Sequence, residues 1–371
     1  MDSADFLIIG GGIAGLSAAA RLARHGRVLV LEAEDALGYH SSGRSVSFSH
    51  YGIGNAAVRA LTAHSRGFFE LPPEGFSPVP LSRTFASLYF AEDRDLPALS
   101  RLRTDMAAFT DAIRLVDEAE MRALCPVLKA PRRGLFDPTG LKLDADALLQ
   151  SFARAVRAAG GEIRTGAAVA AIERRGESWV VDGRHAAPIL INAAGAWADA
   201  VAALAGAAPL GLEPKRRTII AVDPPAEMDI SAWPFTHSVA GDFYMLPEAG
   251  RILASPVDEV PADPCDAQPE DYDLALAADR LEHYTNVPVA RIAHRWAGLR
   301  TFTADRVPTA GFAPDAPGFF WLAGQGGYGL QTAPAMAEIV EALVTGGGWP
   351  VPGVAPEQIL PERLIIAAKT C

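Results

Sequence analysis

The alternation of apolar and polar residues begins with two short apolar runs that flank an apolar helix. Residues 6–9 and 28–31 are uninterrupted hydrophobic stretches, which is typical of strands buried on both faces of a parallel sheet. Residues 16–25 carry apolar side chains at roughly helical spacing and end at Gly26, a residue suited to the left-handed position after a helix. The pattern therefore predicts a strand, a helix and a second strand at the start of the chain.

The same reading predicts the remaining elements. Helical patterns cover residues 58–69, 95–108, 117–124, 144–159 and 271–284. Residues 84–90 alternate as a strand would, and residues 189–199 combine a buried strand, a small-residue turn and a helix. Residues 319–323 form another apolar strand, whereas residues 256–269, rich in proline and acids, are expected to form a surface loop. Strands that alternate with helices in this way predict an α/β fold.

The turn that follows the first strand is the first candidate for a binding site. Gly10, Gly12 and Gly15 have GxGxxG spacing, and Glu32 ends the second strand. The first glycine permits a tight turn, the second allows backbone amides to approach a pyrophosphate, and the third permits close packing of helix and strand. Unpaired amides at the helix start favour phosphate, and Glu32 would accept hydrogen bonds from ribose hydroxyls and repel a 2′-phosphate. A glycine-rich turn can be purely structural, but the complete unit predicts a dinucleotide site that is not for NADP.

Composition narrows the class of protein. The chain has 371 residues, of which 50% are hydrophobic and 21% charged, so we expect about two globular domains. Its formal charge of −11 makes a nucleic-acid partner unexpected. Three cysteines lie far apart without a CxxC pair, which indicates neither a metal site nor a disulfide framework. The acidic start and the lack of a long apolar run predict a cytoplasmic protein without a transmembrane segment, and leave contact with the inner face of the membrane open.

A polar, glycine-rich segment follows Glu32 and can be interpreted in two ways. It could be a solvated loop, as its composition suggests. Alternatively, it passes along the phosphates of the cofactor, and its polar side chains are hydrogen-bond partners there: Ser41, Ser42, Arg44 and Ser45. In the second interpretation the segment brings His50 and Tyr51 close to the chemistry. A histidine can titrate near neutrality, so His50 is a candidate base, although an edge-of-core histidine is the simpler interpretation.

Two later strands carry polar candidates. Arg216 and Arg217 precede apolar residues, and adjacent residues of a strand point to opposite faces. Arg217 shares a face with Ile219 and Ala221, and an inward arginine needs an anion such as a substrate carboxylate. A solvated basic pair is the alternative interpretation. Tyr244 is either a core aromatic residue or a second donor to the same carboxylate.

A second glycine-rich turn, over residues 324–331, opens the last helix more than 300 residues after the first. A nicotinamide enzyme offers no role for this turn. Together with the segment Gly38-Tyr-His-Ser-Ser-Gly43-Arg-Ser and the motif Trp296-Ala-Gly-Leu-Arg300-Thr-Phe, it makes the chain resemble the FAD-dependent D-amino acid oxidase/glycine oxidase superfamily. The closest likeness is to the bacterial D-arginine dehydrogenases, and it runs through nearly the whole chain.

The resemblance implies a Rossmann-like FAD-binding domain and a substrate domain with a mixed sheet. The expected boundaries are 1–50, 142–212 and 300–371 for the first, and 51–141 and 213–299 for the second. No cysteine falls where sarcosine oxidase relatives attach their flavin, so we expect FAD to be non-covalent. The residues implied to contact it, besides the four polar ones named above, are Gly10, Gly12, Ala14, Gly15, Glu32, Ala33, Val46, Val169, Ala193, Gly195, Trp197, Gly326, Gly327, Tyr328, Gly329, Leu330 and Gln331.

The resemblance also implies the chemistry. The substrate carboxylate is held by four side chains: Arg217, Arg300, Tyr51 and Tyr244. The carbonyl near Gly327, with Gln331, receives the amine. Hydride transfer to the flavin gives an imino acid, which water hydrolyses to a 2-oxo acid and ammonia. A quinone, another acceptor or O₂ then takes the electrons.

Phe85 indicates the class of substrate. The resemblance implies that D-arginine dehydrogenases have, at this position, a carboxylate that binds the substrate guanidinium. Burying a guanidinium against phenylalanine is costly, so we expect a D-amino acid with an apolar or aromatic side chain. A core role for Phe85, with an acid elsewhere, is the alternative. Oxidation of an N-methyl amino acid, glycine, a cyclic imino acid or a 2-hydroxy acid is a second function, and a non-catalytic flavin subunit a third. The sequence leaves D or L handedness, the electron acceptor and the oligomeric state open.

Overall fold

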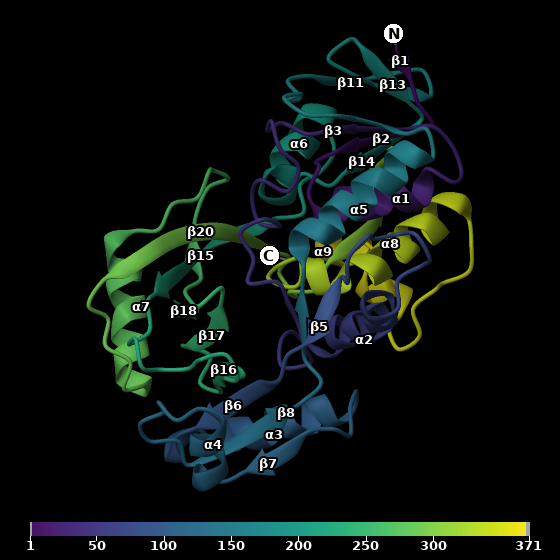
Figure 1. Ribbon diagram of the computed structural model, residues 1–371. Coiled ribbons are helices and arrows are strands. Elements are labelled where there is room, and N and C mark those ends of the chain that lie inside the picture. The colour runs from purple at the N-terminus through teal and green to yellow at the C-terminus, as the bar shows by residue number, and fades with distance from the viewer. Residues whose placement is uncertain (1, 369–371) are drawn as a thin grey trace.

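The computed structural model describes residues 2–368, which form two lobes joined by long strands (Figure 1). The first lobe contains a six-stranded sheet in which every neighbouring pair is parallel except the last. The strands, in spatial order, are β10 (Glu162–Arg164), β3 (Val28–Leu31), β2 (Phe6–Ile9), β14 (Ile189–Asn192), β22 (Phe319–Ala323) and β21 (Thr309–Phe312). All residues of β2 and β3 are buried, which confirms the strands predicted from apolar runs.

Two layers cover this sheet. On one face, Phe6 and Ile8 belong to a core shared with four helices: α1 (Ile13–Leu22), α2 (Ala56–Glu70), α5 (Ala145–Ala158) and α8 (Gly329–Thr345). On the other face, Leu7 and Ile9 pack with α6 (Ala198–Ala205), α9 (Glu362–Ala368) and a small second sheet. That sheet contains β1 (Asp2–Ser3), β13 (His185–Ala187), β12 (Ser178–Val181) and β11 (Ile172–Arg175). Alternate side chains of β2 therefore point to opposite faces of the sheet and belong to two different cores.

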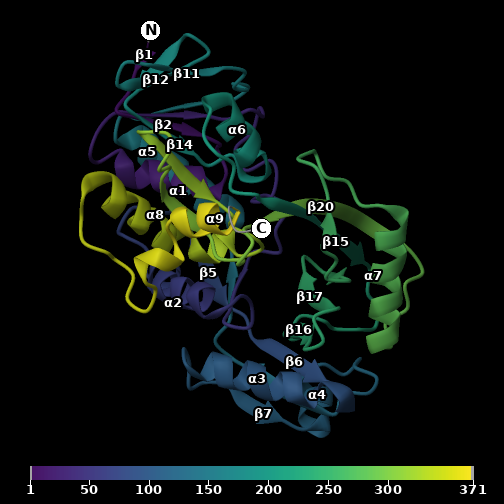
Figure 2. The same cartoon turned by 180° about the vertical axis from the view of Figure 1, so that it is seen from behind.

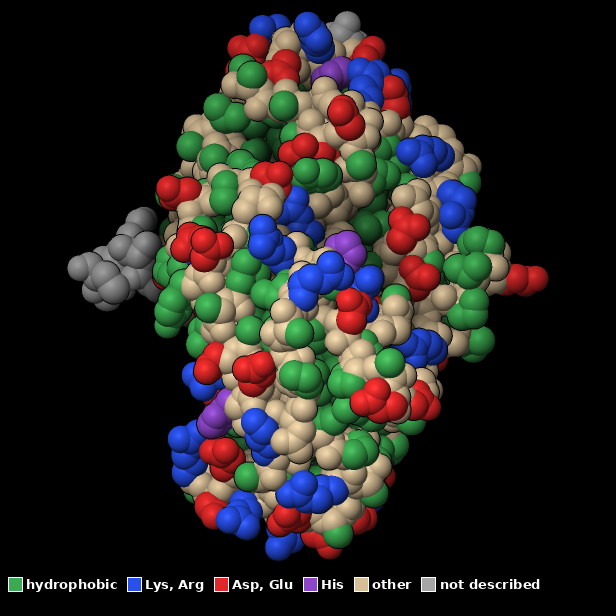
Figure 3. Space-filling view, turned by 60° about the vertical axis from the view of Figure 1, so that its left-hand side comes forward, with side chains coloured by type: hydrophobic (Ala, Val, Ile, Leu, Met, Phe, Trp, Pro, Cys, Tyr) green, Lys and Arg blue, Asp and Glu red, His purple; other side chains and the backbone are tan. Residues whose placement is uncertain are grey.

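The second lobe is organised by a nine-stranded mixed sheet. Its strands are β19 (Val260–Pro261), β15 (Glu213–Val222), β18 (Arg251–Ser255), β17 (Tyr244–Glu248), β16 (Phe235–Ser238), β6 (Ser87–Ala91), β8 (Arg133–Asp137), β7 (Arg114–Val116) and β20 (Ile292–Phe302), which pairs with β15. Both ribbon views place α7 (Asp271–Tyr284) on the outer side of β15 and β18 (Figure 1, Figure 2). Helices α3 (Leu96–Ala107) and α4 (Glu118–Leu124) cover the far end beside β8. On the face shown in Figure 3, acidic and basic side chains are interspersed.

The strand β20 connects the two lobes. It pairs with β15 along most of its length, and Thr301 near its end forms a bridge with Gly326 in the second glycine-rich turn. The boundary expected at residue 300 therefore falls inside one strand. Helix α2, expected in the substrate domain, instead shares the core of the first lobe with α8. A third small sheet of β4 (Phe48–Ser49), β9 (Leu141–Leu143) and β5 (Ser82–Thr84) lies where the lobes meet.

The helices predicted from periodicity are confirmed, most with ends within two residues of those expected. The first is the exception: α1 begins and ends three residues before the predicted range 16–25, so Gly26 lies beyond its C-cap and has no positive φ. The single strand predicted over residues 84–90 is wrong. Residues 85 and 86 interrupt it, because β5 pairs with β9 of the small sheet whereas β6 pairs with β8 and β16 of the large one. Within the described residues, no helix has the length and apolarity that crossing a bilayer requires.

Candidate active site

Close packing around the first turn explains why its glycines are needed. Gly10 has φ of +111°, and a Cβ built on it would lie 2.4 Å from the carbonyl oxygen of Ala193. A Cβ on Gly15 would lie 1.9 Å from the carbonyl oxygen of Gly10. Helix α1, the turn and the end of β14 could not approach so closely with side chains at these positions. The turn leaves the N-terminus of α1 facing a cavity.

This cavity, which we call the nucleotide chamber, has a volume of about 370 Å³. Glu32 lines it, and its carboxylate accepts hydrogen bonds from the amides of Gly11 (2.6 Å) and Glu34 (2.9 Å). The hydroxyl of Ser42 accepts a hydrogen bond from the amide of Ile13 at 3.0 Å, at the start of α1. The walls of the nucleotide chamber include further residues predicted to contact the cofactor: Gly10, Gly12, Ala33, Ser41, Val169, Ala193, Gly195 and Trp197.

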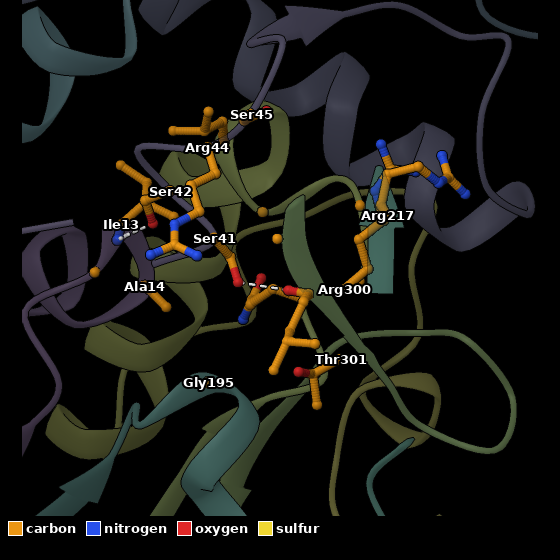
Figure 4. A pocket seen from close by; sticks show the side chains of 18 of the residues that line it. Ile13, Ala14, Ser41, Ser42, Arg44, Ser45, Gly195, Arg217, Arg300 and Thr301 are labelled. Carbon is orange, nitrogen blue, oxygen red and sulfur yellow. Dashed lines mark hydrogen bonds between the residues drawn. The ribbon is translucent and has the colours of Figure 1, made fainter. Parts of the chain in front are cut away.

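A narrower space, the middle chamber, continues from the nucleotide chamber. The two share Gly12, Ser41, Ser42, Ala193 and Gly195, so they form one channel. Figure 4 shows Ser41, Ser42 and Arg44 on one side of the middle chamber and Arg217 and Arg300 on the other. The walls also contain Ala14, Ser45, Val46, Gly326, Gly327, Gly329 and Leu330. Because Gly329 begins α8, both glycine-rich turns and both helix N-termini border the channel, as an elongated anionic dinucleotide requires.

Arg44 lines the channel, but its guanidinium already has protein partners. It donates to the carbonyl oxygens of Ala267 (2.9 Å) and Ala297 (3.2 Å) and forms an ion pair with Asp266. Trp296 in turn donates to the carbonyl oxygen of Arg44 at 3.0 Å. The arginine predicted to bind the cofactor therefore also fixes this segment against β20.

Sheet register explains how Arg217 and Arg300 come together. Arg217 on β15 lies opposite Gly298 on β20, and Arg300 lies opposite Lys215. Arg300 is two residues from Gly298, so the two arginines occupy diagonal positions on the same face of the antiparallel pair. Both side chains line the middle chamber and the chamber beyond it. We call this pair the arginine clamp.

The clamp carries more positive charge than its surroundings compensate. Arg217 is only 4% exposed, and burial together with the charge of Arg300 lowers its pKa to about 10. Its Nε donates to the carbonyl oxygen of Asp258 at 2.7 Å, and its Nη2 lies 3.5 Å from Glu259. Arg300 has no carboxylate within ion-pair distance among the described residues, and its guanidinium lies against Gly327, where a Cβ would approach it to 2.8 Å. A ligand carboxylate would complete this arrangement.

Tyr244 adds a third polar group. Its hydroxyl is buried and has no hydrogen-bond partner among the described residues, and the residue lines the same chamber as the clamp. A buried hydroxyl without a partner is costly and therefore indicates a ligand or a water molecule there. The structure thus brings together three of the four residues predicted to hold the carboxylate.

The chamber beyond the clamp, which we call the aromatic chamber, has a volume of about 610 Å³. It shares Arg217, Arg300 and Gly327 with the middle chamber, so the clamp stands at the junction. Rings form much of its wall: Phe48, His50, Tyr89, Phe235, His237, Phe243, Tyr244, Phe302 and Tyr328. A space of this size and lining accommodates a small organic side chain.

The histidines of this chamber are neutral. Burial, with the charges of Arg59 and Arg300, lowers the pKa of His50 to about 3, in keeping with the interpretation of His50 as a core histidine. The Nδ1 of His50 lies 2.6 Å from the hydroxyl of Tyr89, and burial raises the pKa of that phenol. His237 stacks on Tyr89, and its buried Nε2 has no partner among the described residues. Burial also holds the pKa of His237 well below its ordinary value.

Tyr51 and Phe85 lie outside the chambers. Tyr51 packs in a separate cluster beside Phe109 and Leu99, so its predicted contact with the carboxylate is wrong for this structure. Phe85, in the interruption between β5 and β6, packs behind Phe48 with ring centroids 5.7 Å apart. Phe48 itself lines the chamber. Phe85 thus has the core position that was the alternative interpretation.

Gln331, near the start of α8, was predicted to receive the amine. It is 2% exposed and lines the aromatic chamber, but its Nε2 donates to Thr62 (2.8 Å) and its Oε1 accepts from the amide of His50 (3.4 Å). Tyr328 lines the aromatic chamber and donates to the carbonyl oxygen of Arg306.

Several site residues were missed by sequence reasoning. Asp258 and Glu259 lie in the stretch expected to be a surface loop, yet Asp258 is buried and Glu259 lines the aromatic chamber. A signal was present, since two acids closely follow the end of a strand that neighbours the one carrying Arg217. His237 and Arg306 had no local signal.

Among the described residues no group of histidines, cysteines and acids is arranged to hold a metal ion. Cys125 and Cys265 are free thiols, and Cys371 lies outside the described residues.

Comparison with known proteins identifies a family of FAD-dependent enzymes, in agreement with a channel that suits a dinucleotide. The DAO family of FAD dependent oxidoreductases matches residues 5–343. The tRNA 5-methylaminomethyl-2-thiouridine biosynthesis bifunctional protein MnmC of Burkholderia multivorans is 26% identical over 416 residues, covering 98% of this chain and 59% of the relative. The chain therefore spans about three fifths of the length of such curated relatives.

Two solved structures share the fold. L-alpha-glycerophosphate oxidase from Mycoplasma pneumoniae, with FAD bound, has a TM-score of 0.85 and 19% identity, with 96% of this chain and 99% of that chain covered. L-proline dehydrogenase from P. horikoshii has a TM-score of 0.85 and 21% identity, with 99% of both chains covered. At this identity the likeness establishes the fold, including the mixed sheets and the FAD-binding lobe.

Proposed function

The chain belongs to the DAO family of FAD-dependent oxidoreductases, and from this premise we propose that it oxidises a D-amino acid with an apolar or aromatic side chain. The products are a 2-oxo acid and ammonia. The observation that carries the proposal is the arginine clamp: two cations from neighbouring strands, with the unpartnered Tyr244 hydroxyl, at the junction of the FAD channel and an aromatic cavity. The specific likeness to D-arginine dehydrogenases stays a prediction.

The channel fits a non-covalently bound FAD. The glycines of the first turn and the N-terminus of α1 would hold the pyrophosphate, and Glu32 the ribose. The N-terminus of α8, entered through Gly327 and Gly329, would favour negative charge on the ring system. When bound, FAD supplies the two-electron oxidant.

The side chains would orient the substrate. The clamp and Tyr244 fix the carboxylate, which restricts the position of Cα relative to the channel, and such alignment supplies much of a rate enhancement. Two adjacent guanidinium groups disfavour a third cation, so they favour the neutral form of the amine. The carbonyl near Gly327 and the amide oxygen of Gln331 are the acceptors available to its N–H groups. His50, neutral and buried, contributes shape and polarity rather than a positive charge.

The aromatic chamber supports an apolar or aromatic side chain. The two carboxylates in its lining, Glu259 and Asp305, form ion pairs with Arg306 and Arg363 respectively. A substrate guanidinium or ammonium would therefore find no uncommitted acid among the lining residues, and burying it there would be unfavourable. This argument replaces the one based on Phe85, which does not reach the chamber.

A second candidate is oxidation of a secondary amine, either an N-methyl amino acid or a cyclic imino acid, by the same clamp and channel. The solved relative named for L-proline supports it, because its fold matches over 99% of both chains. Glycine and 2-hydroxy acids are further alternatives that the clamp would accept.

Anaerobic mixing tests the proposal. The holoenzyme is combined with D- and L-amino acids, N-methyl amino acids, proline and 2-hydroxy acids, and the loss of oxidised flavin absorbance is followed. We expect the fastest bleaching with an apolar or aromatic D-amino acid and release of ammonia. Preference for D-arginine or D-lysine would contradict the assigned side-chain class, and methylamine among the products would favour the second candidate. If no carboxylate substrate bleaches the flavin, the proposed function is wrong. Admission of air then distinguishes an oxidase from a dehydrogenase that needs a quinone or another acceptor.

A further inference from the structure

Glu259 stands between a cation inside the site and a cation at its edge. Its carboxylate accepts hydrogen bonds from Nη1 (3.0 Å) and Nη2 (2.7 Å) of Arg306, a bidentate ion pair. The same carboxylate lies 3.5 Å from Nη2 of Arg217. The side chain of Arg306 is 47% exposed and that of Arg217 only 4% exposed. Glu259 therefore links the arginine clamp electrostatically to the surface.

The backbone on both sides of this ion pair is strained. Val257 has φ of +56° and Arg306 has φ of +62°, and both residues line the aromatic chamber. A β-branched residue rarely adopts a positive φ, and such strain concentrates at functional sites. Tertiary contacts hold both turns in place. The amide of Val257 donates to the hydroxyl of Ser255 at 3.2 Å, and the guanidinium of Arg306 lies 3.9 Å from the ring centroid of Phe302.

Two carboxylates lie within ion-pair distance of Arg217: Glu259 at 3.5 Å from Nη2 and Asp258 at 3.7 Å from Nε. Of the two, Glu259 also contacts Arg306. The neighbouring Asp258 has a different task, because both of its carboxylate oxygens accept from the amide of Thr218, at 2.8 and 3.0 Å. Burial opposes ionisation of Glu259, but the hydrogen bond and charge of Arg306, with the charge of Arg217, lower its pKa overall. Arg217 of the clamp and Arg306 at the edge of the site thus share the carboxylate of Glu259, whose better-formed contacts are to Arg306.

We propose that Glu259 is an internal counter-carboxylate that competes with the substrate carboxylate for Arg217 and thereby sets the affinity of the clamp. This inference rests on the proposed function. Arg306 determines the strength of the competition, because it holds Glu259 away from closer contact with Arg217. Glu259 and Arg306 are then residues that tune anion binding without touching the reacting atoms.

The proposal predicts opposite effects from removing the two partners of one ion pair. Glu259→Gln removes the competitor, so binding of a carboxylate should tighten roughly fivefold, the scale of a partly exposed ion pair. Arg306→Gln frees Glu259 to approach Arg217, so binding should weaken by a similar factor. In the double variant the effect of Glu259→Gln should dominate. An ion pair with a purely structural role would give changes of the same sign.

The experiment is calorimetric titration of the holoenzyme with benzoate, an aromatic carboxylate that has no amine to oxidise. Two variants serve as controls for the change in net charge: Asp223→Asn, from the ion pair with Arg251, and Arg114→Gln, from the ion pair with Glu120. Glu259→Asp is a second variant, whose shorter side chain should also relieve competition but to a smaller extent.

Opposite shifts in the benzoate Kd for Glu259→Gln and Arg306→Gln, beyond those of the controls, would support the proposal. Shifts of the same sign, or equal to those of the controls, would overturn it. Arg217→Met distinguishes this failure from failure of the proposed function. If Arg217→Met binds benzoate as tightly as the unmodified protein, the clamp itself is wrong.

Discussion

Arg216 and Arg217 are neighbours on β15 but have opposite environments. Arg216 faces α7, where its Nε donates to Asp273 at 3.0 Å and its Nη1 pairs with Glu270 at 2.5 Å. Despite burial, these acids raise its pKa, whereas burial and Arg300 lower the pKa of Arg217. One face of the strand therefore carries a cation with close carboxylate partners, whereas the cation on the other face has carboxylates only at 3.5 and 3.7 Å and faces a second arginine.

The different environments of Arg216 and Arg217 indicate two roles for a buried arginine, one in stability and one in ligand binding. An arginine with a buried acid partner supports the fold, because loss of either member leaves an isolated charge. An arginine that is desolvated and faces a second cation does not stabilise the protein in this way. Such an arrangement is explained by a ligand that supplies the missing negative charge. Four predictions test this contrast.

The largest effect is expected on the compensated face. Arg216→Met leaves the carboxylate of Asp273, which is 2% exposed, without its cation, and should lower the free energy of unfolding by about 3–5 kcal/mol. Urea unfolding measures this loss, and turnover per folded molecule should be unchanged. A large loss of kcat/KM in the folded variant would contradict the separation of the two faces.

On the other face, Arg217→Met should reduce kcat/KM for the preferred amino acid by roughly 10²- to 10³-fold, because a charge-assisted contact to the carboxylate is removed. The free energy of unfolding should fall less than in Arg216→Met, because Asp258, which lies 3.7 Å from Arg217, keeps its hydrogen bonds from the amide of Thr218. Steady-state kinetics and urea unfolding together check both parts. If this variant instead lost several kcal/mol of stability with ordinary kinetics, Arg217 would be a structural residue.

The neutral histidines give a pH dependence. In the unfolded chain His50 has an ordinary pKa near 6.5, whereas in the fold it titrates at about 3. Between these values the unfolded chain binds a proton that the folded chain excludes, so stability is lost as the pH falls below about 6.5. The share of His50 at pH 5 is about 2 kcal/mol.

His50→Asn should therefore reduce the difference in unfolding free energy between pH 7 and pH 5 by that amount. Urea unfolding at the two pH values is the measurement. The exposed His294 supplies the control variant, His294→Asn, and an equal change in both variants would refute the assignment.

The smallest effect belongs to Tyr244→Phe. This change removes one neutral donor to the carboxylate and also removes a buried hydroxyl that lacks a partner. We expect substrate binding to weaken by about 1 kcal/mol, or five- to tenfold, with stability equal or slightly higher. Benzoate titration and thermal unfolding check this pair of outcomes. Weaker stability with unchanged binding would place the hydroxyl outside the anion site.

The nucleotide end of the channel could be predicted because its information is local. Gly10, Gly12, Gly15 and Glu32 lie within one strand–helix–strand unit whose spacing fixes their geometry. The family of FAD-dependent oxidoreductases and its fold were also predicted correctly from motifs.

The aromatic chamber could be predicted only in part, since it is assembled from distant segments. Alternation along β15 indicated correctly that Arg217 points inward. It failed for Phe85, because a switch between two sheets at residues 85 and 86 has no period that a sequence pattern reveals. Tyr51 was misplaced: its neighbours His50 and Gly52 border the chamber, whereas Tyr51 itself packs in a separate cluster. The contacts of Glu259 with Arg217 and Arg306 join segments that are distant in sequence, and the positive φ of the nearby Val257 could not be predicted from a β-branched side chain.

The strand β20 has a mechanical consequence. This strand carries Arg300, pairs with the strand that carries Arg217, and forms the bridge between Thr301 and Gly326 one residue before its end. These pairings fix the separation between the clamp and the second glycine-rich turn. We expect the two lobes to keep their relative placement during turnover, because hinge opening would have to break the pairing of β20 with β15 or its bridge to Gly326.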